Sequence, residues 1–329
     1  RIVFTGTNAQ NVTGKRDLWI ERTIRTALID EAAAVLVTSM PMCRITGAQY
    51  DRIIGGMGAT RPVIEVPGHS LRGDWLDGYA ETLAAIARHK ELPRARRAKD
   101  AVALVGYLHD RNEGDHAGNR RELRRILAGL GLELASVWPG GGRWAELGDV
   151  ARAGTIVSLP YGRAAARTLA ERTGARLIET GVPIGIDGTR RWVEAVGAGC
   201  ARTARAERFA RAECRRLGAR IGRLVPFYFL NRNVALLADP HMLGGLAGLC
   251  TDLGMRVRLA ASVGREAHAP EELRTELGPG VAVLHEAPVT AFEMGRLRAA
   301  GLRETDLAIV PAELVHGLAR QLPVVDFGV

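Results

Sequence analysis

Short apolar runs alternate with longer amphipathic stretches along the whole of this 329-residue chain. The apolar runs are continuous and do not alternate with polar residues, which is typical of strands that are buried on both faces. The pattern predicts strands at Ile2–Thr5, Ala33–Thr38, Val63–Val66, Ala101–Tyr107, Glu133–Val137, Thr155–Leu159, Arg176–Glu179, Val234–Ala238, Arg256–Ala261, Val281–Leu284, Leu307–Val310 and Val324–Phe327.

Helical spacing fills the segments between these runs. It predicts helices at about Arg16–Asp30, Trp75–His89, Asn119–Leu130, Arg163–Thr173, Gly188–Arg220, Pro240–Leu253, Val289–Ala299 and Ala312–Arg320. Strands and helices in steady alternation indicate an α/β fold whose parallel sheets are covered by helices on both faces.

One segment in the last third of the chain shows the plan most clearly. Val234–Ala238 is apolar, Asp239 suits a helix N-cap, and Pro240 suits the first helical position. Gly254 then suits the end of the helix. We expect the same strand-then-helix plan throughout the chain.

Two boundaries divide the chain. The basic, proline-containing segment Leu92–Lys99 predicts a linker, and Arg223–Asn233 separates a long helix from a new strand. We therefore expect three Rossmann-like units, at residues 1–95, 99–222 and 223–329, with ligand sites beyond the carboxyl ends of their strands. The chain begins without a methionine and ends inside an apolar run, so we interpret it as a fragment whose first unit is incomplete.

Composition narrows the class of protein. Hydrophobic residues make up 47% of the chain and charged residues 25%, which is typical of a globular protein and excludes disorder, collagen and coiled coil. The apolar runs are far shorter than the roughly 20 residues of a membrane-spanning helix. No charged start followed by an apolar segment suggests a secretory signal. We expect no membrane insertion.

The net charge of +9 raises the question of a nucleic-acid partner. All but three of the basic residues are arginines, and most are dispersed through an Ala- and Gly-rich chain. The densest run, Arg202–Arg223, has a spacing of three or four, which predicts a solvated helix face with ion pairs to Glu207 and Glu213. No aromatic residues alternate with these arginines to stack bases, so we expect no nucleic-acid partner.

The four cysteines are widely separated and form no Cys-x-x-Cys pair, which excludes a zinc site or a disulfide framework. Cys200, Cys214 and Cys250 fall in predicted helices, where we expect small packed side chains. Cys43 differs because it lies in a loop, Met40–Cys43, that follows a strand. Its thiolate could face a cofactor, and the alternative is a buried free thiol.

Several motifs are absent. No Gly-x-Gly-x-x-Gly follows a first strand and no Gly-x₄-Gly-Lys-Ser/Thr occurs, so neither a dinucleotide fingerprint nor an ATP-binding P-loop is expected. No Gly-x-Ser-x-Gly marks a nucleophile. Asp74, Asp77 and Glu81 share one face of a predicted helix, either as ordinary first-turn acids or as catalytic carboxylates.

Five segments together resemble a known family. They are Lys15–Leu18, leading a helix into the strand VLVTS; the loop ITGAQYD at Ile45–Asp51; VIEVPGHSLRGDWLDGY at Val63–Tyr79; GVPIGIDGTRRWVEAV at Gly181–Val196; and NVALLADPHMLGGLAGLCTDLGM at Asn233–Met255. Their order and spacing resemble subunits of component 1 of nitrogenase and of nitrogenase-like oxidoreductases. That family includes protochlorophyllide and chlorophyllide reductases and the scaffolds that assemble the nitrogenase cofactor.

The resemblance implies three Rossmann-like domains around a central cleft. It also implies a cytoplasmic heterodimer or heterotetramer with a homologous subunit, which receives electrons from an ATP-dependent iron–sulfur reductase and reduces a small molecule such as a tetrapyrrole. This chain itself would bind no nucleotide. Two alternatives stay open: a non-catalytic scaffold subunit for cofactor assembly, and a nucleotide-binding α/β enzyme.

Departures from the family pattern bear on the site. Members that hold a [4Fe–4S] or larger cluster supply three cysteines, two of them upstream of the helix that begins near Lys15. The third directly follows the strand, where this chain has Met40, so Cys43 is the candidate ligand of a cluster shared at a subunit interface. Ser158 stands where the nitrogenase catalytic subunit has a cysteine ligand, which argues against that subunit.

Overall fold

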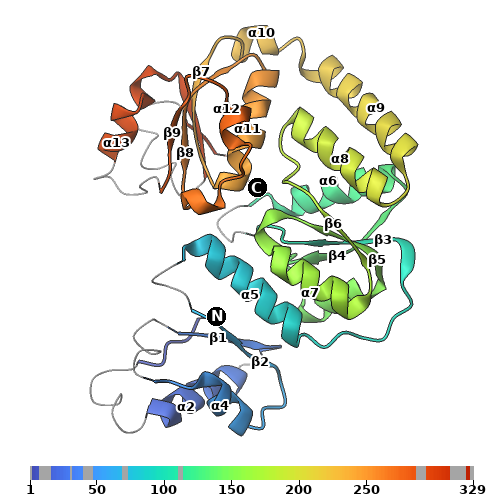
Figure 1. Cartoon of the computed structure of the whole chain (residues 1–329), viewed down its shortest axis with the longest axis vertical. Coiled ribbons are helices and arrows are strands. Elements are labelled where there is room, and N and C mark those ends of the chain that lie inside the picture. The colour runs from blue at the N-terminus through green and yellow to red at the C-terminus, as the bar shows by residue number, and fades with distance from the viewer. Residues whose placement is uncertain are drawn as a thin grey trace.

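A computed structural model describes residues 2–6, 16–29, 32–39, 47–68, 73–109, 114–286, 294–311 and 324–326. Its strands form three separate sheets, and every strand pair is parallel. Figure 1 shows the sheets following one another along the long axis of the molecule, in the order of the sequence. The parallel α/β architecture expected from the alternating pattern is therefore confirmed.

The first sheet holds two strands, β1 (Val35–Thr38) and β2 (Val63–Val66). Helices α2 (Arg16–Ile29) and α4 (Tyr50–Gly56) pack on it through a small apolar cluster: Ile20, Ile24, Tyr50, Ile53 and Met57. The strand expected at Ile2–Thr5 is wrong, because these residues pair with no strand among the described residues. An apolar segment forms a strand only where the edge of a sheet is available to form backbone hydrogen bonds with it.

The second sheet has the order β4-β3-β5-β6. Its strands are β3 (Ala98–Val105), β4 (Glu133–Trp138), β5 (Ala153–Ser158) and β6 (Arg176–Glu179). Its helices are α5 (Trp75–His89), α6 (His116–Gly129), α7 (Arg163–Thr173), α8 (Ile186–Gly199) and α9 (Thr203–Ile221), with short 3₁₀ helices η1 (Trp144–Arg152) and η2 (Pro160–Gly162). Central strand β3 is buried from Ala101 to Val105, which explains its unbroken apolar sequence.

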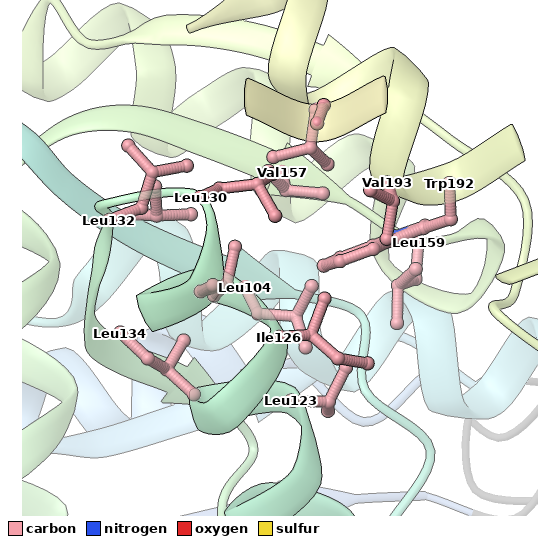
Figure 2. Packing of buried hydrophobic residues seen from close by; sticks show 14 of the residues in the cluster. Leu104, Leu123, Ile126, Leu130, Leu132, Leu134, Val157, Leu159, Trp192 and Val193 are labelled. Carbon is pink, nitrogen blue, oxygen red and sulfur yellow. The ribbon is translucent and has the colours of Figure 1, made fainter. Parts of the chain in front are cut away.

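Two apolar clusters cover the faces of the second sheet. On one face, α6, α8 and α9 pack on the sheet, and Figure 2 shows Ile126 beside Leu104, with Val193 near Trp192 and Leu159. On the other face, α5 and α7 pack against β3 and β5. Helix α5 also contacts the first sheet, where Ala85 packs with Ile64 and Val66. The division of the chain at 95–99 and 222–223 stays a prediction.

The single helix expected at Gly188–Arg220 is wrong, because the structure has two helices, α8 and α9, that pack side by side. The chain reverses at Ala201, whose φ is 56°. A Cβ on Gly197 would lie 2.3 Å from the Ala206 Cβ, so this glycine lets the two helices approach closely. Because the chain reverses, both helices pack on the sheet. A single straight helix of this length would extend beyond the sheet.

The third sheet has the order β11-β10-β7-β8-β9. Its strands are β7 (Asn233–Ala238), β8 (Arg256–Ser262), β9 (Ala282–Leu284), β10 (Leu307–Val310) and β11 (Val324–Asp326). Its helices are α10 (Val225–Tyr228), α11 (Pro240–Asp252), α12 (Leu273–Leu277), α13 (Met294–Ala299), η3 (Glu266–His268) and η4 (Leu302–Glu304).

The start of α11 confirms the expected cap. The Asp239 side chain accepts a hydrogen bond from the His241 backbone N–H, and Pro240 occupies the first helical position. Gly254 follows the helix with a φ of 75°. In the described parts of the chain, no helix combines the length and the apolar composition that crossing a membrane requires.

Candidate active site where two sheets meet

The carboxyl ends of the second and third sheets face each other, and a buried hydrogen bond joins them. Tyr161 lies in η2, directly after β5, and Asp239 directly follows β7. The Tyr161 hydroxyl donates to Asp239 Oδ2 at 2.8 Å, and both residues are buried. Ligands of parallel α/β sheets bind at these strand ends, so this contact locates the candidate site.

Burial sets the protonation of this pair. It raises the pKa of Asp239 to about 6, although hydrogen bonds from Tyr161 and from the backbone of α11 oppose the change. Burial and the neighbouring Asp239 charge also raise the pKa of Tyr161 well above its usual value. The pair is therefore a place where a carboxyl group takes up or releases a proton close to neutral pH.

His241 extends the line of protonatable groups. Its ring lies edge-on to the Tyr161 ring, with 5.2 Å between centroids, and 6.5 Å from the His268 ring. Burial lowers the pKa of His241 to about 4, and the charges of His268 and Arg163 lower it further. Its imidazole is therefore neutral near pH 7 and can donate one hydrogen bond and accept another.

The first turn of α5 meets the third sheet beside these rings. Asp74 and Asp77 form a capping box at the N-terminus of the helix. Asp74 Oδ2 also accepts the Arg265 backbone N–H at 2.9 Å. His268 Nε2 lies 3.2 Å from Asp74 Oδ1 and 3.3 Å from Asp77 Oδ2. These contacts fix α5 to the loop after β8.

Asp74, Asp77 and His268 bring together side-chain atoms that could bind a metal ion. One such atom from each residue lies within 4.8 Å of the others. Burial opposes ionisation of Asp74, but the backbone N–H groups of Arg265, Asp77 and Leu76 and the charge of His268 hold its pKa below its usual value. The positive end of α5 and the Arg265 guanidinium, 3.9 Å from Asp77, already supply positive charge. This positive charge beside the two carboxylates weakens their attraction for a metal ion, so the arrangement favours a contact that holds α5 in place over a bound metal ion.

A cavity of about 450 Å³ opens between α5 and the ends of β1 and β2. Thr38 and Ser39 line it from β1, and Glu81 lines it from α5. The Ser39 hydroxyl is buried and has no hydrogen-bond partner among the described residues. Cys43 follows Ser39 in the sequence by four residues but lies outside the described residues, so the predicted ligand is not placed.

Of the other three cysteines, Cys200 and Cys250 pack against apolar clusters as expected, whereas Cys214 is only partly buried, and Cys200 lies in the turn after α8 and not in a helix. The Cys200 Sγ lies 3.8 Å from Thr155 Oγ1, and burial raises its pKa. Cys214 lines the groove between α8 and α9. Cys250 is fully buried, which raises the pKa of its thiol to about 12.

The donors at the candidate site are carboxylates, imidazoles and a phenol, whereas iron–sulfur clusters are held by thiolates. The described residues therefore do not by themselves fit a cluster. Ser158 is buried at the end of β5, and its carbonyl oxygen accepts hydrogen bonds from the Thr180 N–H at 3.0 Å and from Arg163. Its hydroxyl therefore lies at the carboxyl end of β5, two residues before η2.

The model of one protein family, described as nitrogenase component 1 type oxidoreductase, matches residues 10–297. The chain belongs to this family. Membership of the component 1-type oxidoreductases confirms the resemblance drawn from the five segments.

One relative is a subunit of the light-independent protochlorophyllide reductase of Methylobacterium sp. (strain 4-46), which is 32% identical over 146 residues. The match covers 43% of this chain and 28% of the relative, so the chain matches less than a third of that protein's length. Among solved structures, nitrogenase Cp1 at pH 6.5 matches with a TM-score of 0.76 and 16% identity, over 98% of this chain and 75% of that chain. Nitrogenase Cp1 at pH 5 matches with a TM-score of 0.71 and 12% identity, over 98% and 71%. These structures share the fold.

Proposed function

We propose that this chain is a subunit of a two-component oxidoreductase, which accepts electrons from an ATP-dependent iron–sulfur reductase and reduces a small molecule where the second and third sheets meet. The observation that supports it most is the line of protonatable groups from Asp239 and Tyr161 through His241 to His268. Reduction of an organic bond consumes protons as well as electrons, and a group with a pKa near the working pH delivers them best; in this line that group is Asp239, with a pKa of about 6. Membership of an oxidoreductase family supports the electron-transfer part of the proposal.

The side chains divide into two roles in this proposal. Asp239 takes up and releases a proton near pH 6, and the hydrogen bond that it accepts from Tyr161 fixes the orientation of both side chains. His241 passes or accepts a proton as a neutral imidazole. Asp74 and His268 hold α5 against the third sheet and so keep the site closed on that side.

A tetrapyrrole is the substrate class we propose, because one relative is a subunit of a protochlorophyllide reductase. A homologous component 1 subunit would complete the site, in a heterodimer or heterotetramer located in the cytoplasm. The electron carrier would be an iron–sulfur cluster of the [4Fe–4S] type at the subunit interface. Cys43 is the ligand we propose from this chain, since the described donors lack a suitable thiolate.

A scaffold subunit for cofactor assembly is the second candidate. The hydroxyl of Ser158 in place of a thiol supports it, since a scaffold needs fewer fixed ligands at the site. The two candidates differ in turnover. A reductase complex converts substrate repeatedly when supplied with ATP and its electron-donating partner, whereas a scaffold passes a cluster to an acceptor protein once and reduces no substrate.

Cys43→Ala in the full complex tests the cluster ligand and the reductase proposal together. We expect it to lower the iron content and the visible absorbance of the complex and to abolish protochlorophyllide reduction, because an iron–sulfur cluster needs its thiolates. Cys250→Ala is the matched control. Cys250 is buried in the apolar cluster around α11, so its replacement should lower only the stability that comes from packing.

Full iron occupancy in the Cys43→Ala complex would reject Cys43 as a ligand. If the unaltered complex transfers its iron–sulfur cluster to an acceptor protein and reduces no substrate, the result would support the scaffold function and reject the reductase function. Tight binding of a nucleotide by this chain alone would argue against both.

A further inference from the structure

An apolar corner at α10 is exposed to solvent in the part of the chain that the structure describes. At α10, Phe227 is 77% exposed and Tyr228 is 65% exposed, and Leu224 and Leu230 beside them are each 47% exposed. Figure 1 shows α10 at the outer edge of the molecule, between the end of α9 and the start of β7. Large apolar side chains gathered on a surface in this way mark an interaction site.

The fold does not need these side chains. The inner face of α10 supplies Val225 and Phe229, which pack against the core of the third sheet. The Phe229 N–H also donates to the Val225 carbonyl at 3.1 Å. Val225 and Phe229 therefore hold α10 against the third sheet, while Phe227 and Tyr228 on its other side remain exposed to solvent.

Exposed arginines flank the corner along the chain. Within α9, Arg211 and Arg216 pair with glutamates of the same helix, which confirms the ion pairs expected there. Toward and beyond the end of α9 the arginines are also exposed, but they form no ion pair with any described acidic residue: Arg215, Arg220, Arg223 and Arg232. Arg220 and Arg223 precede the corner in the sequence and Arg232 follows it, so exposed guanidinium groups flank it on both sides along the chain.

We propose that this α10 corner, formed by Leu224, Phe227, Tyr228 and Leu230 with the flanking arginines, binds the surface of an anionic lipid bilayer. Exposed aromatic and leucine side chains next to arginines are the composition of segments that lie in the bilayer interface. Anionic headgroups complement the free guanidinium groups. The contact is peripheral and needs no membrane-spanning helix.

The shape of the corner favours a bilayer over other occupants. Phe227 and Tyr228 are each more than half exposed, so their side chains project from the surface. A bilayer accepts projecting side chains without a matching pocket. A second copy of this chain, docked face to face, would bring the same arginines together and be repelled.

Co-sedimentation of the chain with phospholipid vesicles tests this proposal. We expect binding to vesicles of phosphatidylglycerol and phosphatidylcholine in equal parts, little binding to pure phosphatidylcholine, and loss of binding at high salt. Replacing both aromatic residues, Phe227→Ser with Tyr228→Ser, should lower the vesicle affinity by about tenfold or more. In a separate Phe227→Trp variant, the added fluorescence should shift to the blue when anionic vesicles are present.

Matched variants separate the corner from general charge. Arg220→Gln with Arg223→Gln should weaken vesicle binding by about fivefold per arginine. Arg88→Gln with Arg94→Gln removes the same charge from an exposed region elsewhere and should leave binding nearly unchanged. Leu18→Ser, on exposed α2, is the control for lost apolar surface.

Three results would overturn the proposal. The first is the absence of binding to anionic vesicles. The second is equal weakening by the Arg88/Arg94 pair and the Arg220/Arg223 pair. The third is a Phe227/Tyr228 variant that binds vesicles normally but fails to join its partner subunit, which would assign the corner to a protein contact.

Discussion

Gly106→Ala should destabilise the second sheet by about 4 kcal/mol and disturb Tyr161. Gly106 follows β3 with a φ of 85°, a conformation that costs an L-residue about 1–2 kcal/mol. A Cβ there would lie 2.5 Å from the Gly162 backbone N and 2.8 Å from the Leu159 backbone O. Backbone atoms cannot swing aside as a side-chain end can, so the overpacking adds about 1–3 kcal/mol.

Hydrogen exchange of the β3 amides is the measurement, because a chain with three sheets need not unfold in one step. The variant should exchange these amides faster than the unaltered chain by the factor that its free energy loss predicts. Gly118→Ala in α6 is the control, since the nearest heavy atom to its added Cβ would be 4.0 Å away. It should be neutral or slightly stabilising. Equal effects from the two variants would contradict the close approach at Gly106.

The fold could be predicted largely from the sequence because its strands are continuous apolar runs bounded by capping residues. Strand β10 begins and ends where the run Leu307–Val310 predicts. The break between α8 and α9 could not be predicted, since no proline marks it and Ala201 is an ordinary helix former. What decides the break is the contact between Gly197 and Ala206, which exists only once the two helices pack.

The candidate site was predicted in part. Asp74 and Asp77 stood out as two acids on one helix face, but the residues that meet them, Arg265 and His268, lie about 190 positions further along the chain. No local pattern reports a contact of that separation. Tyr161 and Asp239 did carry a signal, because each follows a predicted strand, and carboxyl strand ends are where such folds bind ligands.

Asp239, which is buried, and His241, which is partly buried, should make opposite contributions to the free energy of unfolding when the pH falls. The pKa of Asp239 is raised to about 6 in the folded chain, so between pH 6 and 4 the folded state binds more protons than the unfolded state. Acidification across that window therefore increases the free energy of unfolding through Asp239. The pKa of His241 is lowered to about 4, so acidification from pH 6.5 to 4 decreases it through His241.

Each contribution amounts to about 3 kcal/mol at its limit. In the unaltered chain the two nearly cancel between pH 6 and 4. His241→Gln removes the decrease in the free energy of unfolding that His241 causes. The free energy of unfolding of this variant, relative to the unaltered chain, should therefore rise as the pH falls from 6.5 to 4. Asp239→Asn removes the gain, and its relative free energy of unfolding should fall between pH 6 and 4.

Hydrogen exchange of the β7 amides across this pH range measures both variants on the sheet that carries the two residues. Exchange rates are first corrected for the intrinsic effect of pH, so that only the opening equilibrium remains. His89→Gln, at the exposed end of α5, is the control and should keep the pH dependence of the unaltered chain. The double variant should show no pH-dependent difference from the unaltered chain, since it removes both opposing groups. Parallel slopes for His241→Gln and Asp239→Asn would mean that burial does not shift these groups in opposite directions, and would remove Asp239 as a proton donor near neutral pH.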